Sequence, residues 1–134
     1  MTSQPFTVLM ADDDIEDIEL VEDAIRASRI DIHLQKVLNG RAALHYLEQT
    51  PDDQLPCLII LDYNMPELNG SEVLSELSKE ARYHSIAKVI LSTSNSPAHI
   101  KECKDKGAIE YFVKPTTMED LNKIVQKLMV YCRI

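Results

Sequence analysis

Basic charge and long apolar runs are both scarce in this chain of 134 residues. Its 14 lysine and arginine residues are outnumbered by 22 aspartate and glutamate residues, which gives a formal net charge of −8. Surfaces that bind duplex nucleic acid usually carry a clustered basic excess, so the composition argues against direct nucleic-acid binding. No apolar stretch reaches the roughly 18 to 20 residues that a membrane helix needs, and we expect no membrane segment.

Glycine is also scarce, and no two of the three glycines share a loop: Gly40, Gly70 and Gly107. Flavin and nucleotide sites on α/β folds depend on glycine-rich loops that hold phosphate groups. The spacing of the glycines therefore argues against a flavin or nucleotide binder.

Cysteine is limited to Cys57, Cys103 and Cys132, an odd number without CxxC spacing. This pattern favours three free thiols in a reducing cytoplasm. The N-terminus lacks the basic start and long apolar core of a signal peptide, which also favours a cytoplasmic location.

What the chain does have is a regular alternation of short apolar runs and amphipathic segments. The expected strands are Phe6–Ala11, Ile32–Leu38, Cys57–Leu61, Ile86–Leu91 and Ile109–Val113. The expected helices cover Asp14–Ser28, Gly40–Gln49, about Ser71–Ala81, Pro97–Lys106 and a last segment that opens on a capping box, Thr116-x-x-Glu119. Five successive βα units predict an α/β protein with a doubly wound, five-stranded parallel sheet.

The helical spacing also predicts which side chains are buried. On the first helix the apolar side is expected to contain Ile15, Ile18, Val21 (or Leu20), Ala24 and Ile25. The fourth helix has few apolar residues, which favours a weakly anchored element. A chain of this length is expected to form one domain, residues 1–134, with its core at about residues 6–132 and no output domain.

Polar residues stand where four of the expected strands end. Asp12 and Asp13 follow the first strand, Asp62 follows the third, Ser92 the fourth and Lys114 the fifth. The carboxyl ends of parallel strands share one edge of a sheet, where such folds place their sites. Crowded carboxylates favour Mg²⁺, which prefers oxygen ligands, and a lysine there can hold phosphate oxygens.

Each of these residues also has a simpler interpretation when it is taken alone. Asp14 is expected to cap the first helix, and a single Asp, Ser or Lys after a strand is usually a turn residue or a solvated charge. Pro115 after Lys114 predicts a rigid turn and is a candidate for a cis peptide bond.

Taken together, the spacing of these residues resembles that of response-regulator receiver domains. The segment LDYNMPELNG resembles the family's third-strand motif, and ADDD resembles its acidic pair. Ser92, thirty residues beyond Asp62, matches the switch hydroxyl, and Lys114, twenty-two residues further on, matches the family's lysine. Tyr111, three residues before that lysine, matches the aromatic switch position. The resemblance implies a flavodoxin-like (βα)5 receiver fold with strand order 2-1-3-4-5.

The resemblance also implies roles for individual residues. Asp62 is the expected phosphoacceptor for a sensor histidine kinase or a phosphotransfer protein. Asp13, Asp62 and the backbone carbonyl of Asn64 are the expected ligands of Mg²⁺ (or Mn²⁺), and Asp12 is expected to hold a water on the metal. Ser92 and Lys114 are expected to bind the phosphoryl oxygens.

A switch in surface shape is the implied output. Movement of Ser92 towards the phosphoryl group is expected to leave space for Tyr111 to rotate. This change alters the surface of the fourth helix, fifth strand and fifth helix, which then meets a downstream protein or a second copy of the chain. Asn64 and Ser94 are expected to tune dephosphorylation. The implied protein is a stand-alone signalling protein, with no enzyme activity beyond self-catalysed phosphotransfer and autodephosphorylation.

Two alternatives remain open at the sequence level. A phosphatase of the haloacid-dehalogenase type would use Asp12 as its nucleophile and Asp14 as its acid–base, although no acidic pair follows Lys114 at a later strand end. A degenerate receiver would act only as a binding module, although the acids, hydroxyl and lysine are all present. The interval from Asp13 to Asp62 is longer than usual for receivers, and we assign the excess to a loop at Thr50–Pro56.

Overall fold

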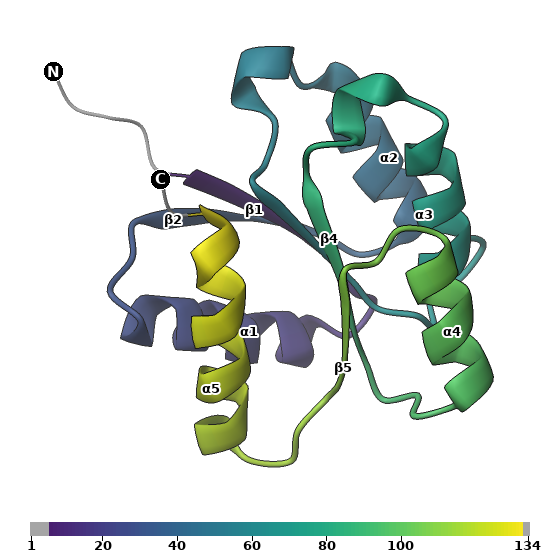
Figure 1. Ribbon diagram of the computed structural model, residues 1–134. Helices are drawn as coiled ribbons and strands as arrows, with labels where there is room; N and C mark the ends of the chain where they lie inside the picture. The colour runs from purple at the N-terminus through teal and green to yellow at the C-terminus, as the bar shows by residue number, and fades with distance from the viewer. Residues whose placement is uncertain (1–5, 133–134) are drawn as a thin grey trace, which may run out of the picture.

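A five-stranded parallel sheet forms the centre of the molecule in the computed structural model, which describes residues 6–132 (Figure 1). Its strands are β1 (Phe6–Ala11), β2 (Ile32–Val37), β3 (Leu58–Leu61), β4 (Ala87–Ser92) and β5 (Glu110–Val113). They lie in the order β2-β1-β3-β4-β5, and every neighbouring pair is parallel. The expected fold and strand order are therefore confirmed.

Helices cover both faces of this sheet. They are α1 (Ile15–Ala27), α2 (Gly40–Gln49), α3 (Gly70–Ser78), α4 (Pro97–Asp105) and α5 (Met118–Met129). Short 3-10 turns are present at η1 (Asp52–Gln54), η2 (Ala81–Tyr83) and η3 (Val130–Cys132). Helices α1 and α5 pack together on one face, and α2, α3 and α4 follow one another on the other (Figure 1). Within residues 6–132, no helix is both long and apolar enough to cross a membrane.

The sheet divides the core into two apolar layers. Because side chains alternate along a strand, successive residues of β1 and β3 enter opposite layers. The layer beneath α1 and α5 includes Val8, Met10, Ile18, Val21, Leu58, Ile60, Val125 and Leu128. The layer beneath α2 to α4 includes Leu9, Ala43, Leu47, Ile59, Leu61, Val73, Leu74 and Leu77. All four residues of β3 are buried, as expected for a strand covered on both faces.

Side-chain caps define where the helices begin. Asp14 caps α1 by accepting hydrogen bonds from the N–H groups of Glu16 and Asp17, as predicted. Asn69 and Glu72 form a capping box at α3. For α5 the predicted cap was wrong by one residue.

Thr117, not Thr116, caps α5, and its side chain accepts from the Asp120 N–H. The turn after Lys114 is one residue longer than the capping pattern implied. On α1, Ile15 was also wrongly placed in the core, since it is 55% exposed at the first position of the helix. Ile18 and Val21 one turn further on are buried.

Pro115 is preceded by a trans peptide bond, since residues 6–132 contain no cis peptide bond, and the cis expectation is wrong. A proline lowers the trans preference to only about 0.5–1 kcal/mol without reversing it. The sequence Lys-Pro therefore marks a turn and does not select the cis isomer.

The cysteines give the largest correction to the predictions. Cys57 and Cys132 form a disulfide, with their Cα atoms 5.3 Å apart, so two of the three expected free thiols are wrong. Cys103 is free and buried, as predicted. The two bonded residues are 75 positions apart in the chain, and only the packing of α5 against β1 and β3 brings them together.

Candidate functional site

The acidic residues predicted at the strand ends meet at the carboxyl edge of the sheet. One oxygen from each of Asp12, Asp13 and Asp62 lies within 4.8 Å of the other two. Asp12 and Asp62 are buried, whereas Asp13 is exposed. Ladder pairing of Ala11 with Leu61 places Asp12 and Asp62 side by side, because each directly follows one of these paired residues.

Lys114 is the cation of this cluster. Its Nζ atom lies 2.8 Å from Asp12 Oδ2, 2.7 Å from Asp17 Oδ2 and 3.4 Å from Asp62 Oδ2. Asp17 was not predicted, although its place in the first turn of α1 puts its carboxylate above the same edge. The sequence signal that could have identified Asp17 is its position three residues after the helix cap Asp14.

Electrostatics in the cluster are only partly balanced. Burial raises the pKa of Asp12, and the Lys114 ammonium and the Asp14 N–H offset part of that rise. The resulting pKa is about 6. Burial by itself would lower the pKa of Lys114, but the carboxylates of Asp12 and Asp17 outweigh it and raise this pKa above its ordinary value. The carboxylates thus hold more negative charge than one lysine neutralises.

The donor set suits a small hard cation. Asp12 Oδ1 accepts the Asp14 N–H at 2.9 Å, while the buried Oδ2 receives no hydrogen bond and has only its ion-pair contact with Lys114. Three carboxylates with a poorly satisfied buried oxygen are the ligands that Mg²⁺ or Mn²⁺ prefers. The residues present therefore fit a divalent cation.

Glycine 70 positions the backbone that carries Asp62. A Cβ atom at Gly70 would lie 2.6 Å from the carbonyl oxygen of Asp62, so only glycine fits without displacement. The Gly70 N–H donates to the Tyr63 carbonyl at 2.9 Å, and the Asp62 N–H donates to Ala11 at 3.0 Å. The loop that contains the exposed Asn64 is thereby closed onto the start of α3.

The expected switch residues lie on the other side of Asp62. Ser92 is fully buried at the end of β4, and its Oγ accepts the Ser94 N–H at 3.2 Å. The Tyr111 hydroxyl donates to the Ser94 carbonyl at 2.8 Å. The ring of Tyr111 packs against the buried layer beneath α2 to α4. Ser92, Ser94 and Tyr111 therefore form one connected unit.

Polar contacts add to the buried Cys103 in holding α4 near this unit, and sequence reasoning missed them. The Tyr63 ring stacks on His99 with centroids 3.9 Å apart, and the Tyr63 hydroxyl donates to Glu102 at 2.7 Å. Ser94 Oγ lies 2.7 Å from His99 Nδ1. Burial, then the Glu102 carboxylate, raises the pKa of Tyr63 to about 12. Cys103 is the buried residue of α4, which agrees with its expected weak anchoring.

A parallel 2-1-3-4-5 sheet with an acidic centre and a lysine at its carboxyl edge defines a class of doubly wound α/β domains. Comparison with known proteins identifies the family within that class. The family model for the response regulator receiver domain matches residues 8–126. The chain belongs to the response regulator receiver domain family.

Individual relatives agree with this assignment. Two-component response regulators ARR8 and ARR9 of Arabidopsis thaliana are each 33% identical, over 96% and 92% of this chain and 63% and 59% of their own length. The chain thus spans about six-tenths of these two relatives. The phosphorylated cyanobacterial phytochrome response regulator RcpA matches with a TM-score of 0.85, 28% identity, and coverage of 95% of this chain and 93% of RcpA. The Mn²⁺-bound form of response regulator Rcp1 matches with a TM-score of 0.82 and 30% identity. The match covers 96% of this chain and 94% of Rcp1.

Proposed function

We propose that the protein is a phosphoacceptor response regulator in which Asp62 receives a phosphoryl group from a sensor histidine kinase or a phosphotransfer protein. The observation that carries this proposal is the convergence of three carboxylates within 4.8 Å, with Lys114 Nζ 3.4 Å from Asp62 Oδ2. Its relatives RcpA and Rcp1, described as phosphorylated and Mn²⁺-bound, support the same chemistry.

Transfer needs little from the protein beyond position and charge. An oxygen of Asp62 forms a bond to phosphorus while the bond from phosphorus to the donor's histidine nitrogen breaks on the opposite side. Lys114 leaves Asp12 and Asp17 to contact the phosphoryl oxygens, and the Ser92 hydroxyl donates to another of them. Asp13, Asp62 and the Asn64 carbonyl would hold Mg²⁺ or Mn²⁺, and such a cation would supply positive charge beside the phosphoryl oxygens.

The output then follows from the unit formed by Ser92, Ser94 and Tyr111. Withdrawal of Ser92 towards the phosphoryl group pulls on Ser94 and frees the Tyr111 hydroxyl. The same movement takes Ser94 away from His99, so α4 loses a contact that holds it. The surface formed by α4, β5 and α5 would then bind a downstream protein or a second copy of the chain in the cytoplasm. Asn64 and Ser94 set how fast water removes the phosphoryl group, and no other catalysis is proposed.

Labelling with a small phosphodonor tests the phosphoacceptor directly. Incubation with phosphoramidate and Mg²⁺ should yield one base-labile acyl phosphate per chain, detected by intact mass. Asp62→Asn should reduce this label at least about a hundredfold, because the attacking oxygen is lost. Asp53→Asn, at an exposed aspartate of η1, is the matched control and should label normally. Label that survives Asp62→Asn and disappears in Asp12→Asn would support the phosphatase alternative.

A second measurement addresses the degenerate receiver. Beryllofluoride mimics an acyl phosphate without turnover, and with Mg²⁺ it should shift the amide resonances of Ser94, Tyr111 and the α4 residues. Absence of any shift at millimolar Mg²⁺ would favour a binding module without a phosphorylation switch.

A further inference from the structure

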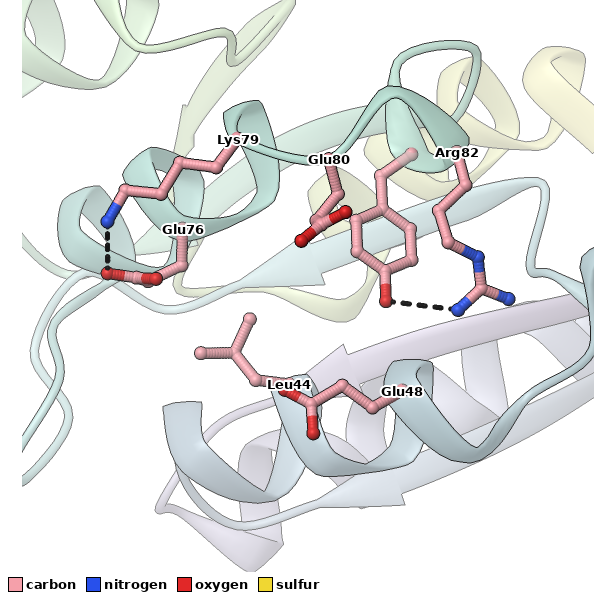
Figure 2. A pocket seen from close by; sticks show the side chains of 7 residues that line it. Leu44, Glu48, Glu76, Lys79, Glu80 and Arg82 are labelled. Atoms are coloured by element: carbon pink, nitrogen blue, oxygen red, sulfur yellow. Dashed lines mark hydrogen bonds and ion pairs between the residues drawn. The ribbon is translucent and has the colours of Figure 1, made fainter.

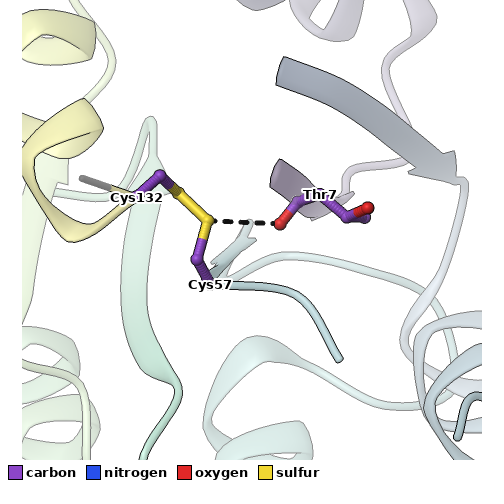
Figure 3. The surroundings of a disulfide bond; sticks show 3 residues. All are labelled: Thr7, Cys57 and Cys132. Carbon is purple, nitrogen blue, oxygen red and sulfur yellow. Dashed lines mark hydrogen bonds between the residues drawn. A yellow bond between two sulfur atoms is a disulfide. The ribbon is translucent and has the colours of Figure 1, made fainter. Parts of the chain in front are cut away.

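The disulfide lies at the edge of the sheet opposite to Asp62. Cys57 stands immediately before β3, whose other end leads to Asp62, and Cys132 is the last residue of η3 after α5 (Figure 3). The bond therefore joins the start of the central strand to the end of the last helical segment. It is therefore separated from the acidic cluster by the length of β3.

The surroundings accommodate the two sulfurs both as a disulfide and as thiols. Cys57 Sγ lies 3.3 Å from the carbonyl oxygen of Thr7, which is the acceptor that an S–H group at Cys57 would need (Figure 3). Cys132 is 2% exposed within the apolar layer beneath α1 and α5, where a thiol behaves as a small apolar group. Neither sulfur requires the bond in order to be satisfied.

Access to the bond is one-sided. Cys57 is partly exposed and lines two surface hollows of about 560 and 570 Å³, formed with the segment of residues 50–56 and with η2. Cys132 lines neither hollow. Thiol–disulfide exchange requires an attacking thiolate to reach one sulfur in line with the bond, so Cys57 is the sulfur open to attack.

We propose that Cys57 and Cys132 are a reversible redox site that exchanges with small or protein thiols and disulfides through Cys57. In oxidation, a thiolate at Cys57 attacks a disulfide RSSR, forms a mixed disulfide and releases RS⁻. The Cys132 thiolate then attacks Cys57 Sγ and releases the second RS⁻. The two cysteines thus lose two protons and two electrons, and RSSR becomes two RSH. Reduction by two RSH follows the same steps in reverse.

The redox state controls how firmly the end of α5 is held. In the oxidised chain the residue before β3 is covalently joined to η3. In the reduced chain η3 depends on the packing of Met129 and Cys132 and on the hydrogen bond from Tyr131 to Glu110 at 2.9 Å. Because α5 and β5 belong to the surface proposed to switch, oxidation stiffens one end of that surface. The redox site itself does not rest on the proposed phosphorylation.

Thiol counting on the intact wild-type chain is the primary test. Samples equilibrated in glutathione buffers of increasing oxidised fraction are quenched in acid, unfolded, alkylated and weighed. We expect three alkylated thiols in reducing buffer, one in oxidising buffer, and a return to three after dithiothreitol. Three thiols in every buffer would overturn the proposal, as would one thiol that dithiothreitol cannot change in the folded chain.

Single variants test the direction of attack. In Cys132→Ser, glutathione disulfide should add one glutathione per chain, mapped by peptide mass to Cys57. In Cys57→Ser, addition at Cys132 should be at least about tenfold slower, because that sulfur is buried. Cys103→Ala is the matched control and should leave both results unchanged, since Cys103 is fully buried with its pKa raised to about 11 by burial. Equal rates at Cys57 and Cys132 would contradict the assignment.

A thermal melt provides a readout that is independent of labelling. Oxidation should raise the melting temperature of the wild-type chain by roughly 10 °C, and Cys132→Ser should abolish the difference between oxidising and reducing buffer. A melting temperature that is the same in both buffers, in a chain shown to be oxidised, would refute the proposed control of α5. Phosphoramidate labelling of Asp62 in both redox states reports separately on the proposed function.

Discussion

Polar groups are poorly paired at the carboxyl ends of the strands (the carboxyl edge of the sheet) and well paired at their amino ends (the amino edge). At the carboxyl edge, Asp12, Asp13 and Asp62 crowd around one lysine, and a buried oxygen of Asp12 lacks a hydrogen bond. At the amino edge, the polar groups around Arg82 are paired. Its Nε lies 2.7 Å from Asp52 Oδ1, and its other nitrogens donate to the carbonyls of Leu47 and Thr50.

Arg82 shows how the amino edge is closed. Its guanidinium group donates to the Tyr83 hydroxyl at 3.4 Å. Arg82 lines a hollow of about 270 Å³ between α2 and η2 (Figure 2). The hydrogen bonds from Arg82 to Asp52 and Thr50 hold the segment of residues 50–56. Sequence reasoning predicted a loop there, and Arg82 gives that loop a fixed position with a turn of 3-10 helix at η1.

Stability and the candidate site are therefore separated along the strands. The amino edge is held by a disulfide and satisfied hydrogen bonds, so the carboxyl edge can retain unfavourable charge. The repulsion that costs folding energy there is what a divalent cation would relieve. Four measurements test whether the two edges differ in this way.

The largest effect is expected from Cys57→Ser at the amino edge. Loss of a disulfide that closes a 75-residue separation should lower the free energy of unfolding by about 4 kcal/mol on the chain-entropy estimate. Urea unfolding in oxidising buffer measures this. The same variant in dithiothreitol is the control, and there the loss should fall below about 1 kcal/mol, because only the Thr7 contact is changed. An equal loss in both buffers would show that packing, not the bond, holds this edge.

Asp12→Asn should act in the opposite direction at the carboxyl edge. The folded-state pKa of Asp12 is raised to about 6 from an ordinary 3.8, so its charged form disfavours folding once the pH exceeds the folded value. Without metal, the variant should gain about 3 kcal/mol over wild type at pH 8. The gain should shrink as the pH falls from 6 towards 4.

Urea unfolding from pH 4 to 8 in the presence of a chelator checks this dependence. Asp53→Asn, which removes an exposed aspartate, is the control and should shift the curve little at any pH. A gain for Asp12→Asn that does not vary with pH would mean that titration of Asp12 is not its cause.

Mg²⁺ should stabilise the wild-type chain through the same cluster. At a free concentration ten times its Kd, a ligand that binds only the folded state adds about 1.4 kcal/mol. Calorimetry with increasing Mg²⁺ should show a rising melting temperature above pH 6, where Asp12 is ionised, and a smaller rise below it. Asp13→Asn should reduce this rise in melting temperature. An unchanged rise would show that the cation does not bind at the carboxyl edge.

Tyr111→Phe is expected to have the smallest effect. It removes the hydrogen bond to the Ser94 carbonyl, which is worth about 1 kcal/mol. Tyr46→Phe, at another half-buried tyrosine, is the matched control. With beryllofluoride and Mg²⁺ bound, the cost of Tyr111→Phe should disappear if the switch has already broken that bond. A cost that persists would exclude Tyr111 from the switch.

Much of the carboxyl edge could be predicted from the chain alone. Asp62 and Ser92 were placed correctly because each ends an apolar run, and the parallel order of such runs assigns their ends to one edge. Asp14 was correctly identified as a helix cap for an equally local reason. The exposure of Ile15 was missed, because helical spacing defines a face without showing where the neighbouring layer ends.

Contacts across the sequence could not be predicted in the same way. Asp17 approaches Lys114 from 97 residues away, and Tyr63 meets Glu102 across 39 residues. Local spacing has no information about such pairs, since they form only when α1 and α4 pack beside the strand ends. Such side chains commonly form ion pairs and hydrogen bonds, and the sequence does not show which of them are close in space.

The order of the elements, and the convergence of Asp12, Asp13 and Asp62 at one edge, follow from the chain alone, because apolar periodicity and the polar residues that end each run are local properties. Tertiary structure alone decided that Cys57 bonds Cys132, that Arg82 closes the amino edge and that Lys114 is shared among three acids. Each of these depends on where separate segments meet once both faces of the sheet are covered. The three aspartates at the carboxyl edge could therefore be predicted from the chain, whereas the long-range contacts at the two edges of the sheet could not.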